Sequence, residues 1–177
     1  MLEKAEIIDF NGHCSIRIAP DRILINQGNC QRSCLTVEDI VTMLPFKEWR
    51  DEHLVITGGE PLLGWQRAYP DLLSHKDMYN LKNLTFETNG TQELHEDFAK
   101  YLKLWNRGSR EITFSVSAKL SASGEKWADA VKPEIVRSYE RVGTTYLKFV
   151  VENPEDFDEV DRAVSEYRKA KFKGVIY

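Results

Sequence analysis

The sequence predicts a single α/β domain built around a parallel sheet, and three observations lead to that expectation. From residue 36 onwards, short apolar segments of strand length alternate with segments of helix length. No internal repeat and no linker rich in Pro, Gly or Ser divides the chain. With 177 residues, 42% of them hydrophobic, the chain can bury one sizeable core but is too short for two comfortable domains.

The first forty residues differ from the rest because they have the pattern of short strands. Strands are expected at residues 5–10, 15–19 and 22–25. A helix is expected over residues 36–44, with Thr36 as its N-cap, acidic residues in its first turn and Pro45 bending or ending it.

The alternation then continues to the end of the chain. Further strands are expected at residues 54–57, 84–88, 112–116 and 146–151, and helices at about 65–74, 94–105, 127–142, with a break near Pro133, and 155–171. Residues 174–177 begin another strand that has nothing after it. We therefore expect the domain to be a fragment or to lack a C-terminal segment.

Composition excludes several functional classes. The 24 Lys and Arg residues against 28 Asp and Glu give a net charge of −4, which argues against a nucleic-acid surface. No segment approaches the roughly 18 apolar residues of a membrane helix, and the first residues are charged where a secretory signal is apolar. We expect a cytoplasmic protein without membrane or nucleic-acid partners, in which Cys14, Cys30 and Cys34 raise the prospect of a metal or iron–sulfur site.

Polar residues follow three consecutive predicted strands. After the strand at 54–57, Gly58 and Gly59 allow the backbone to approach a ligand, and Glu60 can accept charge-assisted hydrogen bonds from an ammonium group. The alternative for this segment is a tight strand-to-helix turn with Pro61 at the first helical position.

The next two strand ends carry comparable chemistry. Glu87 precedes the turn formed by Asn89 and Gly90, and Ser117 and Lys119 follow the third strand. An Asn-Gly pair is often only a hairpin turn, but here a strand precedes it and a helix follows. Because parallel strands end at one edge of a sheet, the three loops together predict a ligand site there.

The segments Thr57-Gly-Gly-Glu-Pro, Glu87-Thr-Asn-Gly-Thr and Ser117-Ala-Lys-Leu-Ser resemble motifs of the 7-carboxy-7-deazaguanine synthase family, radical S-adenosylmethionine enzymes of the queuosine pathway. The resemblance covers about residues 35–177, with Ala118 where the family usually has Pro. It implies a partial, open TIM-type barrel with a radical S-adenosylmethionine core. It also implies a lyase that converts 6-carboxy-5,6,7,8-tetrahydropterin into 7-carboxy-7-deazaguanine.

The resemblance further implies roles for individual residues. Those that would bind S-adenosylmethionine are Gly58, Gly59, Glu60, Glu87, Ser117 and Lys119, with Glu87 near the cofactor's ribose or the substrate. Thr57 would contact the pterin substrate, and Arg17 its carboxylate. A Mg²⁺ ion, an electron donor such as flavodoxin and a homodimer are also implied.

The cysteines depart from the family pattern, which is Cys-x3-Cys-x2-Cys followed by Asp-Thr, with three ligands for a [4Fe–4S] cluster and the Thr for Mg²⁺. Cys30 and Cys34 have the first spacing, but neither a third Cys nor Asp-Thr follows. Either Cys14, Cys30 and Cys34 form an irregular ligand set, or the cluster loop is missing or replaced; the helix start at Thr36 favours the latter. The alternatives to a complete enzyme are therefore an S-adenosylmethionine-binding homologue without radical activity, or an inactive fragment.

Overall fold

A computed structural model of the chain describes residues 15–19, 22–25, 53–64 and 66–177. The strand expected at 5–10, the helix expected at 36–44 and the three cysteines lie outside these residues. The strands β1 (Ser15–Ala19) and β2 (Arg22–Ile25) have the predicted bounds and pair antiparallel.

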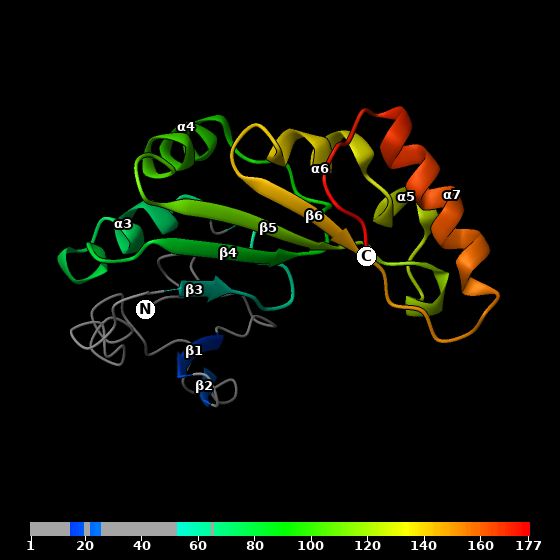
Figure 1. The fold of residues 1–177 in the computed structure, drawn as a ribbon, viewed down its shortest axis with the longest axis horizontal. Coiled ribbons are helices and arrows are strands. Elements are labelled where there is room, and N and C mark those ends of the chain that lie inside the picture. Colours follow the sequence, from blue (N-terminus) through cyan, green and yellow to red (C-terminus); the bar gives the residue numbers. More distant parts are fainter. Residues whose placement is uncertain (1–14, 20–21, 26–52, 65) are drawn as a thin grey trace.

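The main sheet has four parallel strands in the order β3-β4-β5-β6 (Figure 1). Their bounds are His53–Ile56, Asn83–Thr88, Glu111–Ser117 and Thr144–Lys148. Residues 174–177 continue the sheet beside β6, because Ile176 forms a parallel bridge with Leu147. The predicted α/β class is confirmed, and the open, all-parallel sheet is consistent with a partial barrel.

Helices follow the strands and lie on one side of the sheet in Figure 1. They are α3 (Tyr69–Leu73), α4 (Glu96–Trp105), α5 (Trp127–Ala130), α6 (Pro133–Tyr139) and α7 (Asp156–Lys169), with short 3-10 turns at Lys76–Met78 and Ser121–Ser123. None of the helices in the described ranges is long and apolar enough to cross a membrane.

The break expected near Pro133 is confirmed: the segment 127–142 is divided into α5 and α6, because Pro133 cannot continue a helix but suits the first helical turn. Other predicted bounds differ from those observed. The helix expected over 65–74 is shorter and begins only at Tyr69, next to Pro70. The strand expected at 146–151 lies earlier in the chain: β6 begins at the β-branched Thr144 and ends at Lys148.

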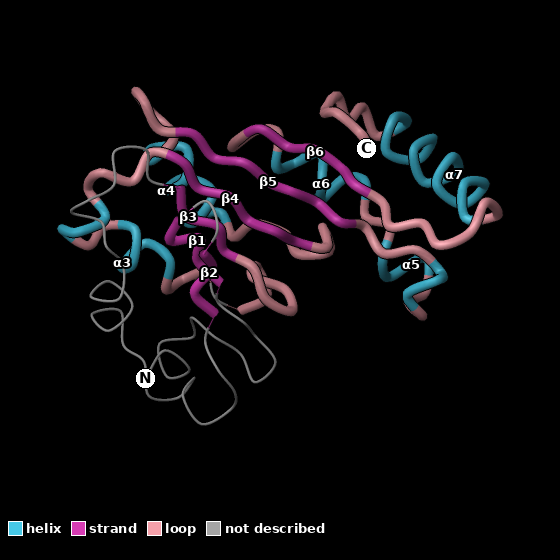
Figure 2. The backbone as a smooth tube through the Cα atoms, turned by 60° about the horizontal axis from the view of Figure 1, so that its bottom comes forward, coloured by secondary structure: helices cyan, strands magenta, loops and turns pink. Residues whose placement is uncertain are grey.

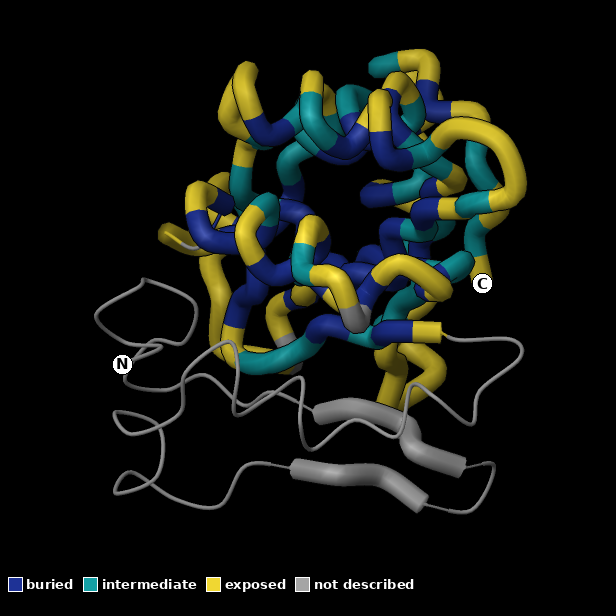
Figure 3. Tube along the Cα trace, turned by 90° about the vertical axis from the view of Figure 1, so that its left-hand side faces the viewer, coloured by how far each residue is buried: buried dark blue, intermediate teal, exposed yellow. Residues whose placement is uncertain are grey.

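An aromatic cluster fills the space between the sheet and the helices. The rings of Phe86 and Phe114, which are register partners on β4 and β5, lie 5.6 Å apart. Tyr69 packs on Phe86 at 5.5 Å, and Tyr139 stacks on Phe114 at 4.7 Å. Figure 3 shows the buried residues gathered between these layers. The cluster holds the carboxyl ends of the central strands in place.

The opposite face of the sheet is polar. Side chains alternate along a strand, so the residues between the aromatic ones project away from the helices. We call this the open face; its residues on the two central strands are Asn83, Thr85, Glu87, Glu111, Thr113, Ser115 and Ser117. In Figure 2, which views the molecule from this side, α4 and α6 lie behind the strands. Glu87 and Glu111 are exposed on this face, whereas Thr85 and Ser115 are buried.

Candidate functional site

The loops after β3 (residues 57–66) and after β4 (residues 89–95) leave the same edge of the sheet, as parallel strands require. Gly58 has φ 149° and Gly90 has φ 79°, backbone conformations that favour glycine. A Cβ atom on Gly90 would lie 2.6 Å from Val116 Cγ1 and 2.8 Å from Val136 Cγ2. The motif glycines therefore satisfy backbone conformation and, at Gly90, close packing.

Glu60 joins the two loops. Its side chain is 7% exposed, and its Oε1 accepts hydrogen bonds from the Leu62 amide at 3.0 Å and the Thr88 hydroxyl at 2.7 Å. Its Oε2 accepts from the Asn89 amide at 2.7 Å. Burial raises the pKa of Glu60, and these three hydrogen bonds act in the lowering direction. Since a carboxylate has about four acceptor positions, about one remains for a ligand.

The loop after β4 is also ordered by its own side chains. Thr88 Oγ1 accepts from the Gly90 amide at 3.1 Å. Asn89 Oδ1 accepts from the amide and the hydroxyl of Thr91, at 3.0 and 2.7 Å. The loop is therefore held in one shape before any ligand contacts it.

Gln66 and Tyr139, which the sequence analysis missed, form hydrogen bonds with the backbone of the two loops. The buried Gln66 donates to the carbonyls of Leu62 and Glu93 and accepts from the His95 amide. The Tyr139 hydroxyl donates to the Gln92 carbonyl. Burial and the nearby Glu60 charge raise the pKa of Tyr139, which keeps the phenol protonated and able to donate. Neither role has a local motif, because each depends on contacts distant in sequence.

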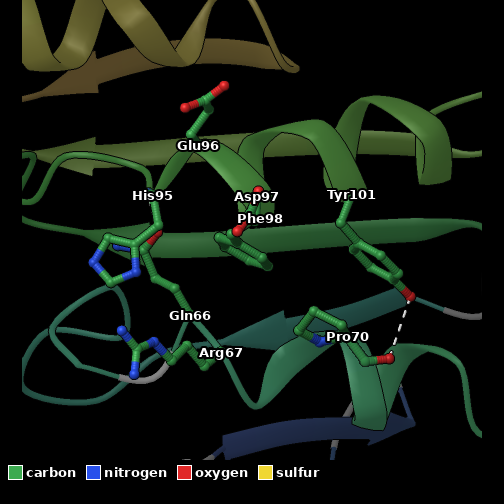
Figure 4. A pocket seen from close by; sticks show the side chains of 8 residues that line it. All are labelled: Gln66, Arg67, Pro70, His95, Glu96, Asp97, Phe98 and Tyr101. Carbon is green, nitrogen blue, oxygen red and sulfur yellow. Dashed lines mark hydrogen bonds between the residues drawn. The ribbon is translucent and has the colours of Figure 1, made fainter.

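A surface groove of about 690 Å³ lies between α3 and α4 (Figure 4). It is lined by Gln66, Arg67, Pro70, His95, Glu96, Asp97, Phe98 and Tyr101. Its charges are mixed, and no residue that the sequence analysis selected lines it. The groove therefore adjoins the ends of the two loops at Gln66 and His95 but contains none of the predicted ligand-binding residues.

The loop after β5 contributes the third motif. Ser117 is half-buried at the end of β5, and Lys119 is exposed. The Ser121 hydroxyl donates to Glu159 Oε2 on α7 at 2.6 Å, which ties the loop to the last helix. This arrangement leaves the Lys119 ammonium at the surface.

Glu87 lies on the open face, where its side chain is 43% exposed. Lys148 at the end of β6, which sequence analysis did not select, places its Nζ 3.4 Å from Glu87 Oε1. A half-exposed pair at this distance contributes little to folding stability. Both charges remain accessible to a ligand.

Other predicted residues occupy less defined positions. Thr57 follows β3 directly. Arg17 pairs with Ile23 between β1 and β2, and β1 lies beside β3 in Figure 1. Among the described residues, no group of three or more His, Cys, Asp or Glu could hold a metal ion. The cysteine ligand set and Mg²⁺ binding remain predictions, because the cysteines lie outside the described part.

Comparison with known proteins gives three relatives, each a 7-carboxy-7-deazaguanine synthase. The protein of Pyrobaculum aerophilum is 31% identical over 115 residues, which are 65% of this chain and 44% of that protein. The protein of Halobacterium salinarum is 30% identical over 148 residues, which are 77% of this chain and 52% of that protein. The protein of Buchnera aphidicola subsp. Schizaphis graminum is 25% identical over 149 residues, which are 84% of this chain and 55% of that protein.

The chain spans about half the length of these curated relatives. No family model and no solved structure matches it. The resemblance carried by the three strand-end motifs is confirmed: over most of its length, this chain is similar to 7-carboxy-7-deazaguanine synthases.

Proposed function

We propose that this chain is a 7-carboxy-7-deazaguanine synthase-type enzyme that binds S-adenosylmethionine at the edge formed by the loops after β3 and β4. The observation that carries the proposal is the buried carboxylate of Glu60, which joins two glycine-containing loops at the carboxyl end of a parallel sheet. Such an edge is where parallel α/β folds place small-molecule sites.

The residues present fit the methionine part of the cofactor. The remaining acceptor position of Glu60 suits an ammonium group, since an ionised acceptor makes a strong hydrogen bond with a charged donor. The Gly58–Gly59 backbone has no side chains to obstruct a close approach. Because both loops are ordered by internal hydrogen bonds, little conformational entropy is lost on binding.

The remaining motif residues orient the ligands. Ser117 supplies a hydroxyl and Lys119 a cation at the neighbouring strand end, while Thr57 and Arg17 are proposed to contact the pterin. A bound iron–sulfur cluster, for which Cys14, Cys30 and Cys34 are the candidate ligands, would together with S-adenosylmethionine supply radical chemistry toward 6-carboxy-5,6,7,8-tetrahydropterin. The chain's own contribution is to hold the two ligands together and to limit the access of water.

The cluster itself is a separate question. Its candidate ligands are Cys14, Cys30 and Cys34, whose spacing differs from the family pattern, and no residue corresponds to the Thr that binds Mg²⁺. This spacing favours a second candidate function, an S-adenosylmethionine-binding homologue without radical activity. A pterin substrate, a flavodoxin-type electron donor and a homodimer belong to the first candidate only.

Anaerobic reconstitution with iron and sulfide, followed by an assay for 7-carboxy-7-deazaguanine, separates the two candidates. Cluster absorbance with product supports the enzyme. Binding of S-adenosylmethionine by calorimetry without cluster or product supports the homologue. Absence of S-adenosylmethionine binding in both preparations would contradict both.

A further inference from the structure

An ion pair crosses the open face near the proposed cofactor site. Glu87 lies on β4 and Lys148 on β6, so the pair passes over the intervening strand β5. In register, Glu87 is opposite Ser115 and Lys148 is opposite Ser117. The two charges therefore meet above the segment of β5 that leads into the third motif.

The pair is suited to exchange its partners. Its two side chains are 43% and 37% exposed, and Nζ lies 3.4 Å from Oε1, so the attraction is largely screened by water. A ligand carboxylate can replace Glu87 at Lys148, and a ligand N–H can donate to Glu87. Neither charge would then be left without a partner.

Ser115 gives a second, independent indication that this surface is functional. Its side chain is fully buried, and its Oγ makes no hydrogen bond within the described structure. Burial without a hydrogen bond is costly for a hydroxyl, so Ser115 calls for a partner that the described structure does not contain. Its register partner on β4 is Glu87. If Lys148 binds a ligand carboxylate instead of Glu87, the Glu87 carboxylate can accept a hydrogen bond from the Ser115 hydroxyl.

We propose that Glu87 and Lys148 bind an N–H group and a carboxylate that are attached to the same carbon atom, with Ser115 as an additional donor to Glu87. The inference rests on the proposed function, in which two ligands carry this group. In S-adenosylmethionine it is the α-amino acid end, whose ammonium the proposed function already assigns to Glu60, so this ligand is the alternative outcome of the test. In 6-carboxy-5,6,7,8-tetrahydropterin it is carbon C6 with its carboxylate and the neighbouring N5–H.

The first test compares Lys148→Met with Lys169→Met by anaerobic calorimetry. Lys169 is a matched control, because it also forms an ion pair, with Glu166 at 2.8 Å, but lies on α7. The tetrahydropterin acid and S-adenosylmethionine are titrated separately. We expect Lys148→Met to weaken the binding of one of them about tenfold or more and Lys169→Met to change neither.

The ligand that weakens identifies the source of the group: the pterin if its binding falls, the cofactor if that of S-adenosylmethionine falls. Unchanged binding of both ligands to a folded Lys148→Met would overturn the inference while leaving the proposed function intact. If the unmodified chain binds neither ligand, the proposed function fails, and the inference with it.

A second test addresses Glu87 with oxidised 6-carboxypterin, which keeps the carboxylate but has no hydrogen on N5. If the pterin is the occupant, the unmodified chain should bind the tetrahydro form more tightly. Its N5–H can donate to the Glu87 carboxylate, whereas the oxidised N5 has only a lone pair, which the carboxylate repels. Glu87→Gln should reduce this preference several-fold, since an amide can donate to that lone pair. If S-adenosylmethionine is the occupant, Glu87→Gln should instead weaken its binding. An unchanged profile for all three ligands would contradict the role of Glu87.

Discussion

Glu60 and Glu87 lie at neighbouring strand ends, yet their surroundings give them opposite properties. Glu60 is buried and bonded to two amides and a hydroxyl from two loops. Glu87 is 43% exposed and has Lys148 at 3.4 Å. Glu60 therefore orders the two loops, whereas Glu87 is the carboxylate that we propose exchanges its partner for a ligand. The four predictions below test this contrast, from the largest expected effect to the smallest.

The largest effect is expected where the ordered loop packs most tightly. Gly90→Ala should lower the free energy of unfolding by about 3 kcal/mol, because the new Cβ atom meets Val116 and Val136 and the left-handed backbone disfavours Ala. Gly124→Ala is the matched control: it has the same φ of 79° but no atom within 4 Å of its Cβ position, so we expect a loss of about 1 kcal/mol. Equal losses in urea denaturation would contradict the packing explanation.

Glu60→Gln should lower the free energy of unfolding by about 2 kcal/mol and weaken S-adenosylmethionine binding. In the unmodified chain the Asn89 amide and the Thr88 hydroxyl both donate to Glu60. The amide group of Gln would place a donor against one of these donors, so a buried hydrogen bond would be lost. Urea denaturation and calorimetry measure the two effects. A variant with unchanged stability and unchanged affinity would show that Glu60 does not order the site.

The stability that depends on Glu60 should also vary with pH. Burial raises its pKa above the ordinary value of 4.5, so the folded chain holds this proton more strongly than the unfolded chain. The stability of the unmodified chain relative to Glu60→Gln should therefore fall as pH rises from about 4.5 through the folded-state pKa. Denaturation at a series of pH values measures this difference. A relative stability that rises with pH would reverse the sign and contradict the dominance of burial.

The smallest effect is expected on the open face. Glu87→Gln and Lys148→Met should each change the free energy of unfolding by less than about 0.5 kcal/mol, since the pair is long and exposed. Their effect belongs to ligand binding instead. A loss comparable to that of Glu60→Gln would mean that this pair is also structural, and the contrast between the two carboxylates would disappear.

Local sequence patterns were sufficient for the architecture. The alternation of apolar segments indicated all four strands of the main sheet, and the glycines after β3 and β4 marked the edge where the loops meet. Proline placement even anticipated the break at Pro133. These features depend on neighbouring residues, which is why the sequence alone reveals them.

The contacts that give the site its character depend instead on residues far apart in the chain. Glu60 meets Thr88 across 28 positions, and Lys148 meets Glu87 across 61. The hydrogen bond from Tyr139 to Gln92 likewise requires α6 to lie over the loop after β4. Sequence analysis expected Glu60 to accept hydrogen bonds from an ammonium group and did not foresee that most of its acceptor positions are used within the chain.

Hydrogen–deuterium exchange with and without S-adenosylmethionine tests the central claim most directly. If the cofactor binds at the strand-end loops, amides in residues 58–63 and 89–92 should exchange more slowly in its presence, while those of α4 beside the groove of Figure 4 keep their rates. Protection confined to α4 and residues 66–70, with both loops unchanged, would place the ligand in the groove and contradict the proposed site.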